Sequence, residues 1–567
     1  MHKRFDSKAA YVWMTGLLIC LGLPGCRRAD SGLRFEVSYP QSAQSGPLDG
    51  RLLLLISTRE DQEPRFHVTS RRDPQPFFGI DVQGWQPGQA AVFDQNVLGY
   101  PLESLRELPT GEYSVQAVLN LYTTFERSDG HTVKMHMDQW EGQRWSSSPG
   151  NLYSPPQKIH IDPAAAETVQ ISLSEVIPPI EPPQDTPYVK HLKIKSELVS
   201  DFWGRDMYIG AVVLLPEGFD EYPEARYPVA YYQGHFTPTF RGFREKPPDP
   251  DASGRQKRSQ QRAYAFYQEW ISDQMPRMLV VVPQDPNPFY DDSYAVNSAN
   301  LGPYGDALTQ ELMPYVEERF RAIGEPWART TYGGSTGGWR ALAVQVFYPD
   351  LFNGSWVFCP DPVDFRYFQL VDIYQDDNAY YPNSQWKKEP LRAWMRSVDD
   401  QVLMNQRQAS ILELVLGNRG RSGQQMDIFQ AVYGPVGDDG YPRLLYDKLT
   451  GEIDKGVVEH WRENYDLRHI LQRDWAELGP KLQGKLRIYM GDTDTYYLEE
   501  ATRLLEEFLE GSSDPHYGGS VEWGERKGHC WSGVPAGRNS TAYYLPQMAE
   551  HIRRTAPAGA DLTSWAY

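Results

Sequence analysis

The sequence predicts an α/β protein, with a mostly parallel sheet and a cap-like helical insertion, preceded by an all-β sandwich domain. Three observations predict this class. Short apolar runs separated by turn residues fill positions 33–177. A proline-rich stretch follows at 178–187, and strand-like and helical segments alternate from 188 to 555. At 567 residues the chain is too long for a single ordinary core, so we expect at least two domains.

The N-terminus has the pattern of a secretory signal. Basic residues in "MHKRFDSK" precede an uncharged apolar run, Ala9 to Leu23, that is too short to span a bilayer as a helix. The "LPGC" that follows resembles a bacterial lipobox, which implies removal of residues 1–25 and lipidation of Cys26. An ordinary signal peptide cut nearby is the alternative. Both patterns predict export, and we expect a lipoprotein anchored to a membrane, periplasmic or at the cell surface.

Residues 33–177 predict a sandwich of roughly immunoglobulin-like size. Runs such as "RLLLLIST" and "TVQISLSEV" are separated by turn residues, and "EYSVQAVLNL" has the two-residue period of a half-buried strand. Four prolines in "PPIEPP" make the segment 178–187 a stiff linker. No catalytic spacing is visible before the linker, so we expect the chemistry beyond it.

From residue 188 the pattern alternates between strands and helices. "HLKIKSEL" and "DMYIGAVVLLP" predict an antiparallel opening pair, and "YPVAYYQG", "MLVVVPQD", "TTYGG", "GSWVFCPD", "KLRIYMGD" and "SVEWGERKG" predict later strands. Helical stretches such as "YLEEATRLLEEFLEG" favour a sheet covered on both faces. Residues 365–480 interrupt this rhythm and are expected to cap one end of the sheet. The charged segment 243–262 predicts a surface loop, and 556–567 a C-terminal tail.

Composition argues against several partners. The net charge of −19 argues against nucleic acid, whose phosphates need a basic surface. No cluster of Cys and His has zinc spacing. We therefore expect no metal and no cofactor, and the sequence leaves the oligomeric state open.

"YGGSTGG" places Ser335 in a G-x-S-x-G pattern between Gly333 and Gly337. The strand-like "RTTY" precedes it and the helical "WRALAVQVFY" follows it. This context is typical of a nucleophile elbow, where a sharp turn exposes the serine and glycines let the backbone pass close to its neighbours. The alternative is a glycine-rich loop with a solvated serine. We expect Ser335 to be a nucleophile.

A serine hydroxyl needs a base, and the base needs an orienting acid. In the order serine, acid, histidine, both partners follow Ser335. Among the later histidines, only His529 in "ERKGHCW" directly follows the last predicted strand. Asp494, a few residues past a strand end in "GDTD", is the expected acid, with Asp492 in reserve.

A tetrahedral oxyanion needs two preorganised N–H donors. Thr336, directly after the serine, is expected to supply one. The other is expected from the loop in "YYQGHF", where Gly234 permits a tight turn and His235 offers its backbone N–H. The His235 imidazole precedes the serine in the chain, so it is not expected to be the base.

"PVAYYQGH", "GDALTQELMPYVEERF", "GGSTGG", "GDTD" and "GHCW" together resemble, in order and spacing, the esterase D family of α/β-hydrolases. This group includes enterochelin, feruloyl and acetylxylan esterases and the antigen 85 mycolyltransferases. The resemblance covers residues 188–555. It implies an α/β-hydrolase fold, a Ser335–Asp494–His529 triad and the two oxyanion donors named above. Two departures are visible: "QGH" replaces the common "HG", and the insertion is larger than simple members carry.

Two cysteines flank the predicted site. Cys359 ends the strand "GSWVFC", and Cys530 directly follows the histidine. Both should face the rim of the site, so we expect a Cys359–Cys530 disulfide that holds the histidine loop. Two buried free thiols are the alternative.

The resulting expectation is an exported serine carboxylesterase. By resemblance and export, its substrate is expected to be an ester of a carbohydrate or a hydroxycinnamate. The same triad would also suit an acyltransferase that delivers the acyl group to an alcohol. A non-catalytic surface-binding protein on a hydrolase scaffold is the alternative from another class.

Overall fold

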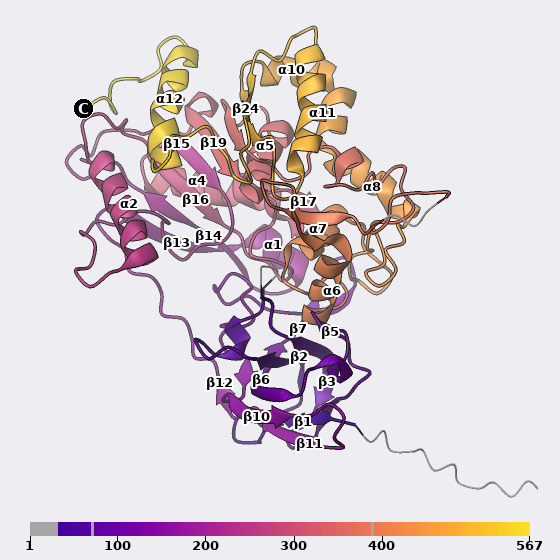
Figure 1. Ribbon diagram of the computed structural model, residues 1–567. Coiled ribbons are helices and arrows are strands. Elements are labelled where there is room, and N and C mark those ends of the chain that lie inside the picture. Colours follow the sequence, from indigo (N-terminus) through magenta and orange to yellow (C-terminus); the bar gives the residue numbers. More distant parts are fainter. Residues whose placement is uncertain (1–31, 70–72, 387–389) are drawn as a thin grey trace, which may run out of the picture.

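A computed structural model describes residues 32–69, 73–386 and 390–567. The expected signal peptide, residues 1–25, and the lipidation site Cys26 lie outside these ranges. Figure 1 shows a small β region below a larger α/β region, with an extended segment joining them. Within the described ranges, no helix has both the length and the apolar character needed to cross a membrane.

The β region is built on two main sheets. One has seven strands, in the order β12-β9-β6-β2-β3-β5 with β10 beside β6, and the other has the order β11-β1-β4. A hairpin of β7 and β8 faces the α/β region (Figure 1). The bounds are β1 Arg34–Ser38, β2 Leu48–Ser57, β3 Phe77–Trp85, β4 Ala91–Phe93, β5 Gly99–Tyr100, β6 Gly111–Leu121, β7 Thr123–Glu126, β8 Thr132–Met135, β9 Leu152–Tyr153, β10 Gln157–Ile161, β11 Thr168–Ser172 and β12 Glu175–Val176.

Strand β2 shows why the run "LLLLI" is apolar without a break. Leu52, Leu54 and Ile56 belong to the core between the two sheets of the β region. Leu53 and Leu55 belong to the larger core, which continues into the α/β region. Successive side chains leave opposite faces of a strand, so a strand covered on both faces is apolar at every position. The seven-stranded sheet is therefore packed on both sides.

Polar contacts also join the β region to helix α6 (Gln406–Leu416). Arg51 Nε donates to the Val415 carbonyl oxygen at 3.0 Å, and Arg51 Nη1 pairs with Asp81 at 3.0 Å. Arg421 Nη2 reaches the other oxygen of Asp81 at 2.7 Å. Both arginines are buried, so these charge-assisted bonds are shielded from water. The two regions form one packed unit, although residues 178–187 between them form neither helix nor strand.

Gly79 in β3 lies directly against this contact. A Cβ atom at Gly79 would come closer than 3.0 Å to the Val415 carbonyl oxygen and to the Arg51 guanidinium. We expect Gly79→Ala to separate the two regions locally and to lower the free energy of unfolding by about 1–3 kcal/mol, measured by urea denaturation. Gly46→Ala is the control, because a Cβ at Gly46 has nothing within 4 Å. Equal stability of the two variants would contradict a tight contact at Gly79.

The α/β region is built on a sheet in the order β13-β14-β16-β15-β19-β20-β23-β24. β13 and β14 are antiparallel, which confirms the predicted opening pair, and β14 is also antiparallel to β16. All later neighbours in this order are parallel, so the sheet is mixed. The bounds are β13 Val189–Ser196, β14 Met207–Leu214, β15 Val229–Gln233, β16 Leu279–Gln284, β19 Arg329–Gly334, β20 Ser355–Phe358, β23 Leu486–Gly491 and β24 Ser520–Gly524.

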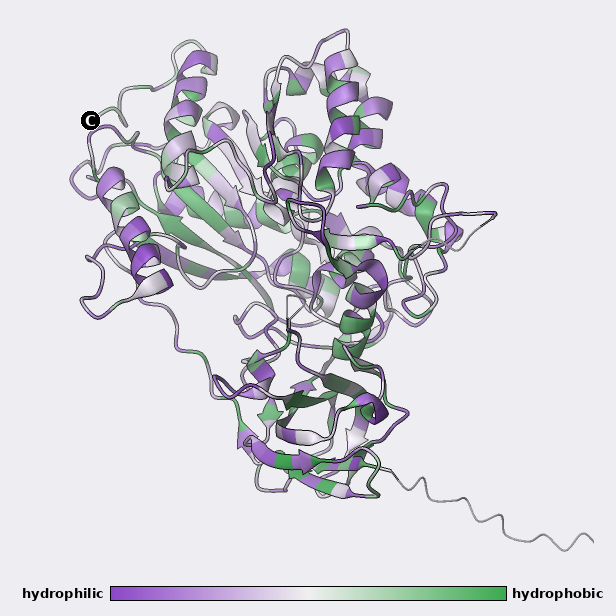
Figure 2. Cartoon of the chain, viewed as in Figure 1, coloured by the Kyte–Doolittle hydropathy of each residue, from purple (hydrophilic) through white to green (hydrophobic). Residues whose placement is uncertain are grey.

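Helices pack around this sheet, and its central strands are hydrophobic along their length (Figure 2). Every residue of β16 is buried, as expected for a strand covered on both faces. A short pair, β17 (Asn297–Ser298) and β18 (Gly302–Pro303), precedes the helical segment that leads to β19. The helix bounds are α1 Glu197–Trp203, α2 Gly254–Trp270, α3 Tyr304–Asp306, a π-helical turn Ala307–Leu312, α4 Met313–Arg319, α5 Thr336–Phe347, α11 Leu498–Gly511 and α12 Ser540–Thr555.

The segment 243–262 is not entirely a loop, because α2 begins at Gly254. The buried residues of α2 are Phe266 and Trp270, one helical turn apart. Both lie beyond the charged segment, so residues 243–262 do not show the repeating apolar positions that would predict a helix. The predicted loop is wrong for its second half.

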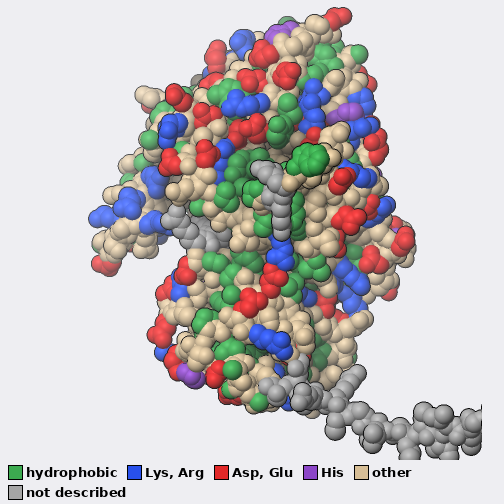
Figure 3. Space-filling view, turned by 45° about the vertical axis from the view of Figure 1, so that its right-hand side comes forward, with side chains coloured by type: hydrophobic (Ala, Val, Ile, Leu, Met, Phe, Trp, Pro, Cys, Tyr) green, Lys and Arg blue, Asp and Glu red, His purple; other side chains and the backbone are tan. Residues whose placement is uncertain are grey.

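Residues 365–480 lie between β20 and β23. Their bounds are β21 Ala393–Arg396, β22 Val402–Asn405, α6 as above, α7 Gln425–Tyr433, α8 Lys455–Tyr465, α9 Leu467–Arg473 and α10 Trp475–Leu482. Aromatic rings fill the interior of this insertion: Phe365, Phe368 and Trp461 contact one another edge to face. On the face shown in Figure 3, acidic and basic side chains are interspersed, and the basic ones do not gather in a patch.

Candidate active site

Ser335 sits at the sharp turn between β19 and α5. Its backbone has φ 60° and ψ −125°, a conformation that non-glycine residues rarely adopt. A Cβ on Gly333 would come closer than 3.0 Å to the Gly337 carbonyl oxygen, and one on Gly337 would do the same at the Gln233 carbonyl oxygen. These two glycines are therefore needed because the backbones of the turn, of α5 and of β15 approach too closely for a side chain.

One hydrogen-bonded chain connects Ser335, His529 and Asp494. His529 Nε2 lies 2.9 Å from Ser335 Oγ, and His529 Nδ1 lies 2.8 Å from Asp494 Oδ2. The carboxylate can only accept, so Nδ1 carries a hydrogen and Nε2 is left to accept from the serine. The Asp494 side chain is fully buried, and its other oxygen accepts the Tyr496 N–H at 2.8 Å. This arrangement holds the imidazole in the tautomer and orientation that proton abstraction from serine requires.

The three residues come from the same edge of the sheet. Ser335 directly follows β19, Asp494 lies three residues after β23, and His529 follows β24. Parallel strands bring their carboxyl ends to one edge, which gathers residues that are distant in sequence. Asp492, the reserve acid, has no hydrogen bond to His529 among the described residues.

The two expected oxyanion donors lie at the same edge. Thr336 is the first residue of α5, and its N–H donates to no acceptor among the described residues, as is usual at a helix start. The His235 N–H is likewise without an acceptor in the described part of the chain. The His235 ring is engaged elsewhere, with Nδ1 3.1 Å from Asp291 Oδ1. His235 lines the same cavity as Ser335.

Residues 203–427 match the family model described as "Putative esterase". The match covers less than half of the chain and shows similarity of this segment to that family. The matched segment contains Ser335 and Thr336 and ends before Asp494 and His529. This similarity supports a carboxylic ester hydrolase.

Solved structures similar to the chain include other esterases and hydrolases. A ferulic acid esterase has 14% identity and a TM-score of 0.36, with 64% of this chain and 99% of that chain covered. S-formylglutathione hydrolase from Agrobacterium tumefaciens has 14% identity and a TM-score of 0.33, with 66% and 98% covered. MPT51 (FbpC1) from Mycobacterium tuberculosis has 12% identity and a TM-score of 0.33, with 65% and 100% covered. No curated protein matches the sequence.

The cavity beside Ser335 in the α/β region has a volume of about 320 Å³. Its aromatic wall consists of Trp394, Phe429 and Tyr496, and the ring of Tyr496 contacts His529 edge to face. Trp394 and Phe429 belong to the insertion 365–480, so the insertion forms part of the site. The sequence analysis does not single out these aromatic residues, because in the sequence they resemble ordinary core residues.

Asp361 is a second residue that the sequence analysis does not identify. Its Oδ1 lies 3.4 Å from Ser335 Oγ, while its Oδ2 accepts hydrogen bonds from Thr336 Oγ1 at 2.9 Å and Tyr294 Oη at 2.7 Å. Burial raises the pKa of Asp361, although these hydrogen bonds oppose the rise. Its position contained a signal: Asp361 lies three residues after β20, the same offset as Asp494 from β23.

The expected disulfide between Cys359 and Cys530 is wrong for this structure, because both residues are free thiols. They are nonetheless neighbours: both sulfur atoms and a ring nitrogen of His529 lie within 4.8 Å of one another. Both residues have positive φ, 37° for Cys359 and 63° for Cys530, so backbone strain gathers around the site.

This pair changes the electrostatics of the histidine. The interaction with Cys359 has the largest effect on the Cys530 thiol and lowers its pKa. Burial opposes this effect, whereas the contact with His529 adds to it. The resulting pKa of Cys530 is about 5. Burial alone would lower the pKa of His529, but the hydrogen bonds with Asp494 and Cys530 raise it well above its usual value of 6.5. The imidazole therefore has a negatively charged neighbour in addition to Asp494.

We expect this environment to give the esterase an alkaline pH profile. The base must be neutral to accept the serine proton, and a raised pKa keeps His529 protonated to higher pH. The kcat/KM for p-nitrophenyl acetate should therefore increase with pH, with a midpoint well above 6.5. Cys530→Ser removes the thiolate and should move this midpoint to lower pH. His460→Gln, in α8, is the control that should leave it unchanged, and equal midpoints for wild type and Cys530→Ser would contradict the assignment.

Proposed function

We propose that the protein is a serine carboxylesterase that acts through an acyl-enzyme on Ser335. The observation that carries this proposal is the hydrogen-bonded chain from Asp494 through His529 to Ser335. The Ser335 hydroxyl gives its proton to His529 Nε2 as Oγ bonds to the ester carbonyl carbon. The Thr336 and His235 N–H groups donate to the resulting oxyanion.

The remaining steps follow from the same groups. Protonated His529 gives its proton to the alcohol oxygen as the carbon–oxygen bond of the ester breaks, which leaves the acyl group on Ser335. Water then enters, His529 takes one of its protons, and the second tetrahedral intermediate collapses to release the acid and restore the serine hydroxyl. Asp494 remains ionised throughout and stabilises the imidazolium.

The residues that line the cavity favour a substrate with a planar, aromatic acyl group. Trp394, Phe429 and Tyr496 offer three rings around a cavity of about 320 Å³, and aromatic surfaces bind flat rings by stacking and edge contacts. Gln369 and Gln425 add polar groups that suit a phenol hydroxyl or a sugar hydroxyl. The proposed substrate is therefore a hydroxycinnamoyl or similar aryl ester, with a carbohydrate as the alcohol.

A substrate screen with the purified protein tests this proposal. Feruloyl, benzoyl and acetyl esters of p-nitrophenol and of a simple sugar are compared by kcat/KM, and the acyl-enzyme is trapped by rapid acid quench and located by mass spectrometry. We expect the acyl mass on the peptide that contains Ser335 and a preference for aryl acyl groups. Hydrolysis without an adduct at Ser335 would reject the proposed mechanism. A preference for acetyl esters would reject only the proposed specificity for an aromatic acyl group.

We also propose that the protein is exported and anchored through a lipid on Cys26. The support is the charged start, the apolar run and the "LPGC" sequence before Cys26. The test is fractionation of cells that express wild type or Cys26→Ser. Wild type should sediment with membranes and Cys26→Ser should be soluble, whereas the same distribution for both would reject the anchor.

A further inference from the structure

The side chains of a histidine and two aspartates meet beside the proposed active site, in a cluster whose side chains the proposed hydrolysis does not use. His235 Nδ1 lies 3.1 Å from Asp291 Oδ1 and 3.2 Å from Asp292 Oδ2. The three donor atoms all lie within 4.8 Å of one another. Metal–ligand bonds of about 2.0–2.2 Å put neighbouring ligand atoms about 3.0–3.4 Å apart, so both nitrogen–oxygen distances fit two edges of a coordination shell.

Asp292 gives an independent indication of a ligand. Its side chain is 1% exposed, and its Oδ2 accepts no hydrogen bond from the described residues although it points at His235 Nδ1. A buried carboxylate oxygen without a hydrogen bond is costly unless something satisfies it. The other oxygen is satisfied, because it accepts the Tyr294 N–H at 3.0 Å and faces Arg340 Nη1 at 3.4 Å.

The balance of charge also favours a cation. Asp285, Asp291 and Asp292 gather around one guanidinium, that of Arg340. Arg340, Asp285 and Asp292 are buried, with side-chain exposures of 0%, 1% and 1%. Arg340 Nη2 donates a hydrogen bond to Asp285 at 2.8 Å, so the charges of Arg340 and Asp285 already cancel each other. Asp291 and Asp292 instead face the His235 ring, and a divalent ion held by the neutral imidazole would supply the positive charge that a ring proton otherwise supplies there.

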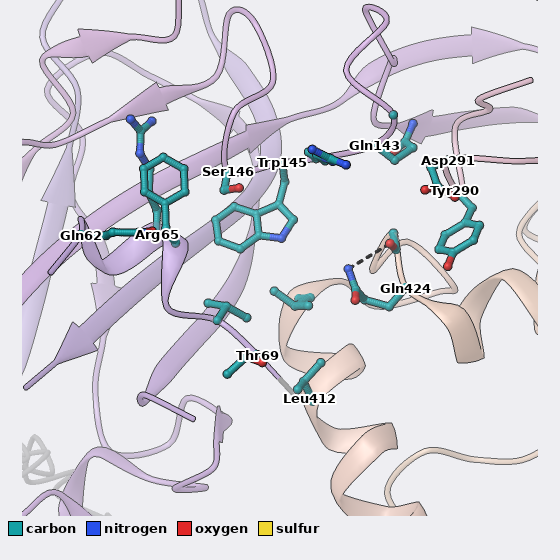
Figure 4. A pocket seen from close by; sticks show the side chains of 16 residues that line it. Gln62, Arg65, Thr69, Gln143, Trp145, Ser146, Tyr290, Asp291, Leu412 and Gln424 are labelled. Atoms are coloured by element: carbon teal, nitrogen blue, oxygen red, sulfur yellow. Dashed lines mark hydrogen bonds between the residues drawn. The ribbon is translucent and has the colours of Figure 1, made fainter. Parts of the chain in front are cut away.

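Solvent can reach this cluster from the junction of the two regions. A cavity of about 540 Å³ lies there, and Asp291 and Tyr290 form one of its sides, across from Gln62 and Arg65 (Figure 4). The Asp291 side chain is 20% exposed and that of His235 is 36% exposed, and His235 faces the cavity of Ser335. The cluster thus has an entry path and room for water to complete a coordination shell.

We propose that His235, Asp291 and Asp292 bind one divalent transition-metal ion, Zn²⁺ or Mn²⁺. An imidazole nitrogen with two carboxylate oxygens suits these ions, whereas Ca²⁺ and Mg²⁺ prefer oxygen ligands alone. The ligands are spread over two loops, one after β15 and one after β16, and His235 is 56 residues from Asp291. A search for closely spaced Cys and His residues therefore does not find them, which is why the sequence analysis expects no metal.

Such an ion would join two loops at the edge of the active site. The loop after β15 carries the His235 N–H, and neighbouring strands β15 and β16 place the two loops side by side. The binding itself goes beyond the proposed ester hydrolysis and is independent of it, because it is measured as metal content and stability rather than as turnover. Only its role in holding the oxyanion donor rests on the proposed function.

Metal content and thermal stability of the untagged protein test the site. The protein is stripped with EDTA, mixed with one equivalent of Zn²⁺, Mn²⁺, Ca²⁺ or Mg²⁺, desalted and analysed by inductively coupled plasma mass spectrometry and thermal unfolding. We expect close to one Zn²⁺ or Mn²⁺ per chain, a lower Tm after EDTA and recovery of Tm with the same ion. Binding of Ca²⁺ or Mg²⁺ in their place would overturn the assignment of the ion, and no stoichiometric binding would overturn the site.

Variants locate the ion. Asp291→Asn and Asp292→Asn should each weaken binding roughly tenfold or more. Asp291 is partly exposed, so its variant tests the site even if the buried Asp292→Asn fails to fold. Asp185→Asn is the matched control, because Asp185 also pairs with a histidine, His191, at 3.0 Å, and the described residues place no third potential ligand beside this pair. Unchanged binding in Asp291→Asn, with Tm intact, would overturn the proposal.

A second cluster supplies a further control. Cys359, His529 and Cys530 also bring three donor atoms within 4.8 Å. Cys530→Ser should keep the ion and its effect on Tm. Loss of the ion in Cys530→Ser, with retention in both aspartate variants, would place the metal at the thiols and overturn the proposal.

Discussion

Ser335→Ala is expected to lower kcat for p-nitrophenyl acetate by roughly 10⁶-fold. The substitution removes the oxygen proposed to form the acyl-enzyme, and the His529 base then has no hydroxyl to deprotonate at 2.9 Å. Residual hydrolysis should remain above the water rate, because the Thr336 and His235 N–H groups can still polarise a bound carbonyl. The measurement is initial rate against substrate concentration at a fixed alkaline pH.

Two controls separate chemistry from folding. Ser532→Ala lies on the same loop as His529 and removes a hydroxyl that has no hydrogen bond to the imidazole among the described residues, so its kcat should stay near that of wild type. A fluorophosphonate probe should label wild type and Ser532→Ala but not Ser335→Ala. Wild-type rates in Ser335→Ala, with a normal thermal unfolding curve, would show that hydrolysis takes place elsewhere in the chain.

The sequence was informative where local pattern and chain order carry the chemistry. Ser335 could be placed at a strand–turn–helix junction because close backbone approach there requires glycine at positions 333 and 337. Both glycines can be read directly from the sequence. His529 and Asp494 could be selected because a parallel sheet gathers the carboxyl ends of its strands at one edge. The opening antiparallel pair was visible from its two apolar runs. In each case the signal lies within a few residues of a strand end.

What the sequence did not reveal depends on contacts between distant segments. Asp361 becomes part of the site only because β20 lies beside β19, which brings its carboxylate 3.4 Å from Ser335 Oγ. Trp394 and Phe429 line the cavity only because the insertion folds back over the sheet edge, and aromatic residues in a helical segment resemble core residues. The free thiols at 359 and 530 depend on a sulfur–sulfur distance that no sequence spacing specifies.

The sequence also did not reveal that the seven-stranded sheet of the β region packs on both faces, because that packing too depends on distant segments. Alternation in the strand β6 suggested one buried and one open face, yet Val118 joins the large core while Val115 and Ala117 join the smaller one. The unbroken run in β2 was the better guide, because only a strand covered on both faces needs apolar residues at every position. A proline-rich linker therefore does not imply a freely moving β region, and Arg51 and Arg421 join it to the insertion that forms one wall of the active site.

Asp494→Asn is expected to lower kcat by roughly 10⁴-fold at neutral pH while the fold is retained. An asparagine can donate its Nδ2–H to His529 Nδ1, which would place the imidazole hydrogen on Nε2, the atom that must accept from Ser335. The variant would thus hold the histidine in the wrong tautomer and also lose the charge that stabilises the imidazolium. The loss should appear in kcat more than in KM, because Asp494 is fully buried and does not line the substrate cavity.

Asp492→Asn is the matched control for this prediction. Asp492 lies two residues earlier on the same loop, and its N–H donates to the Gly524 carbonyl oxygen, a bond that the substitution keeps. We therefore expect Asp492→Asn to retain kcat within a few-fold of wild type. The reverse outcome, with a large loss in Asp492→Asn and near wild-type turnover in Asp494→Asn, would mean that the acid reaches His529 from position 492. It would also mean that the 2.8 Å contact between His529 and Asp494 has no part in turnover, because only Asp494→Asn removes the carboxylate from that contact.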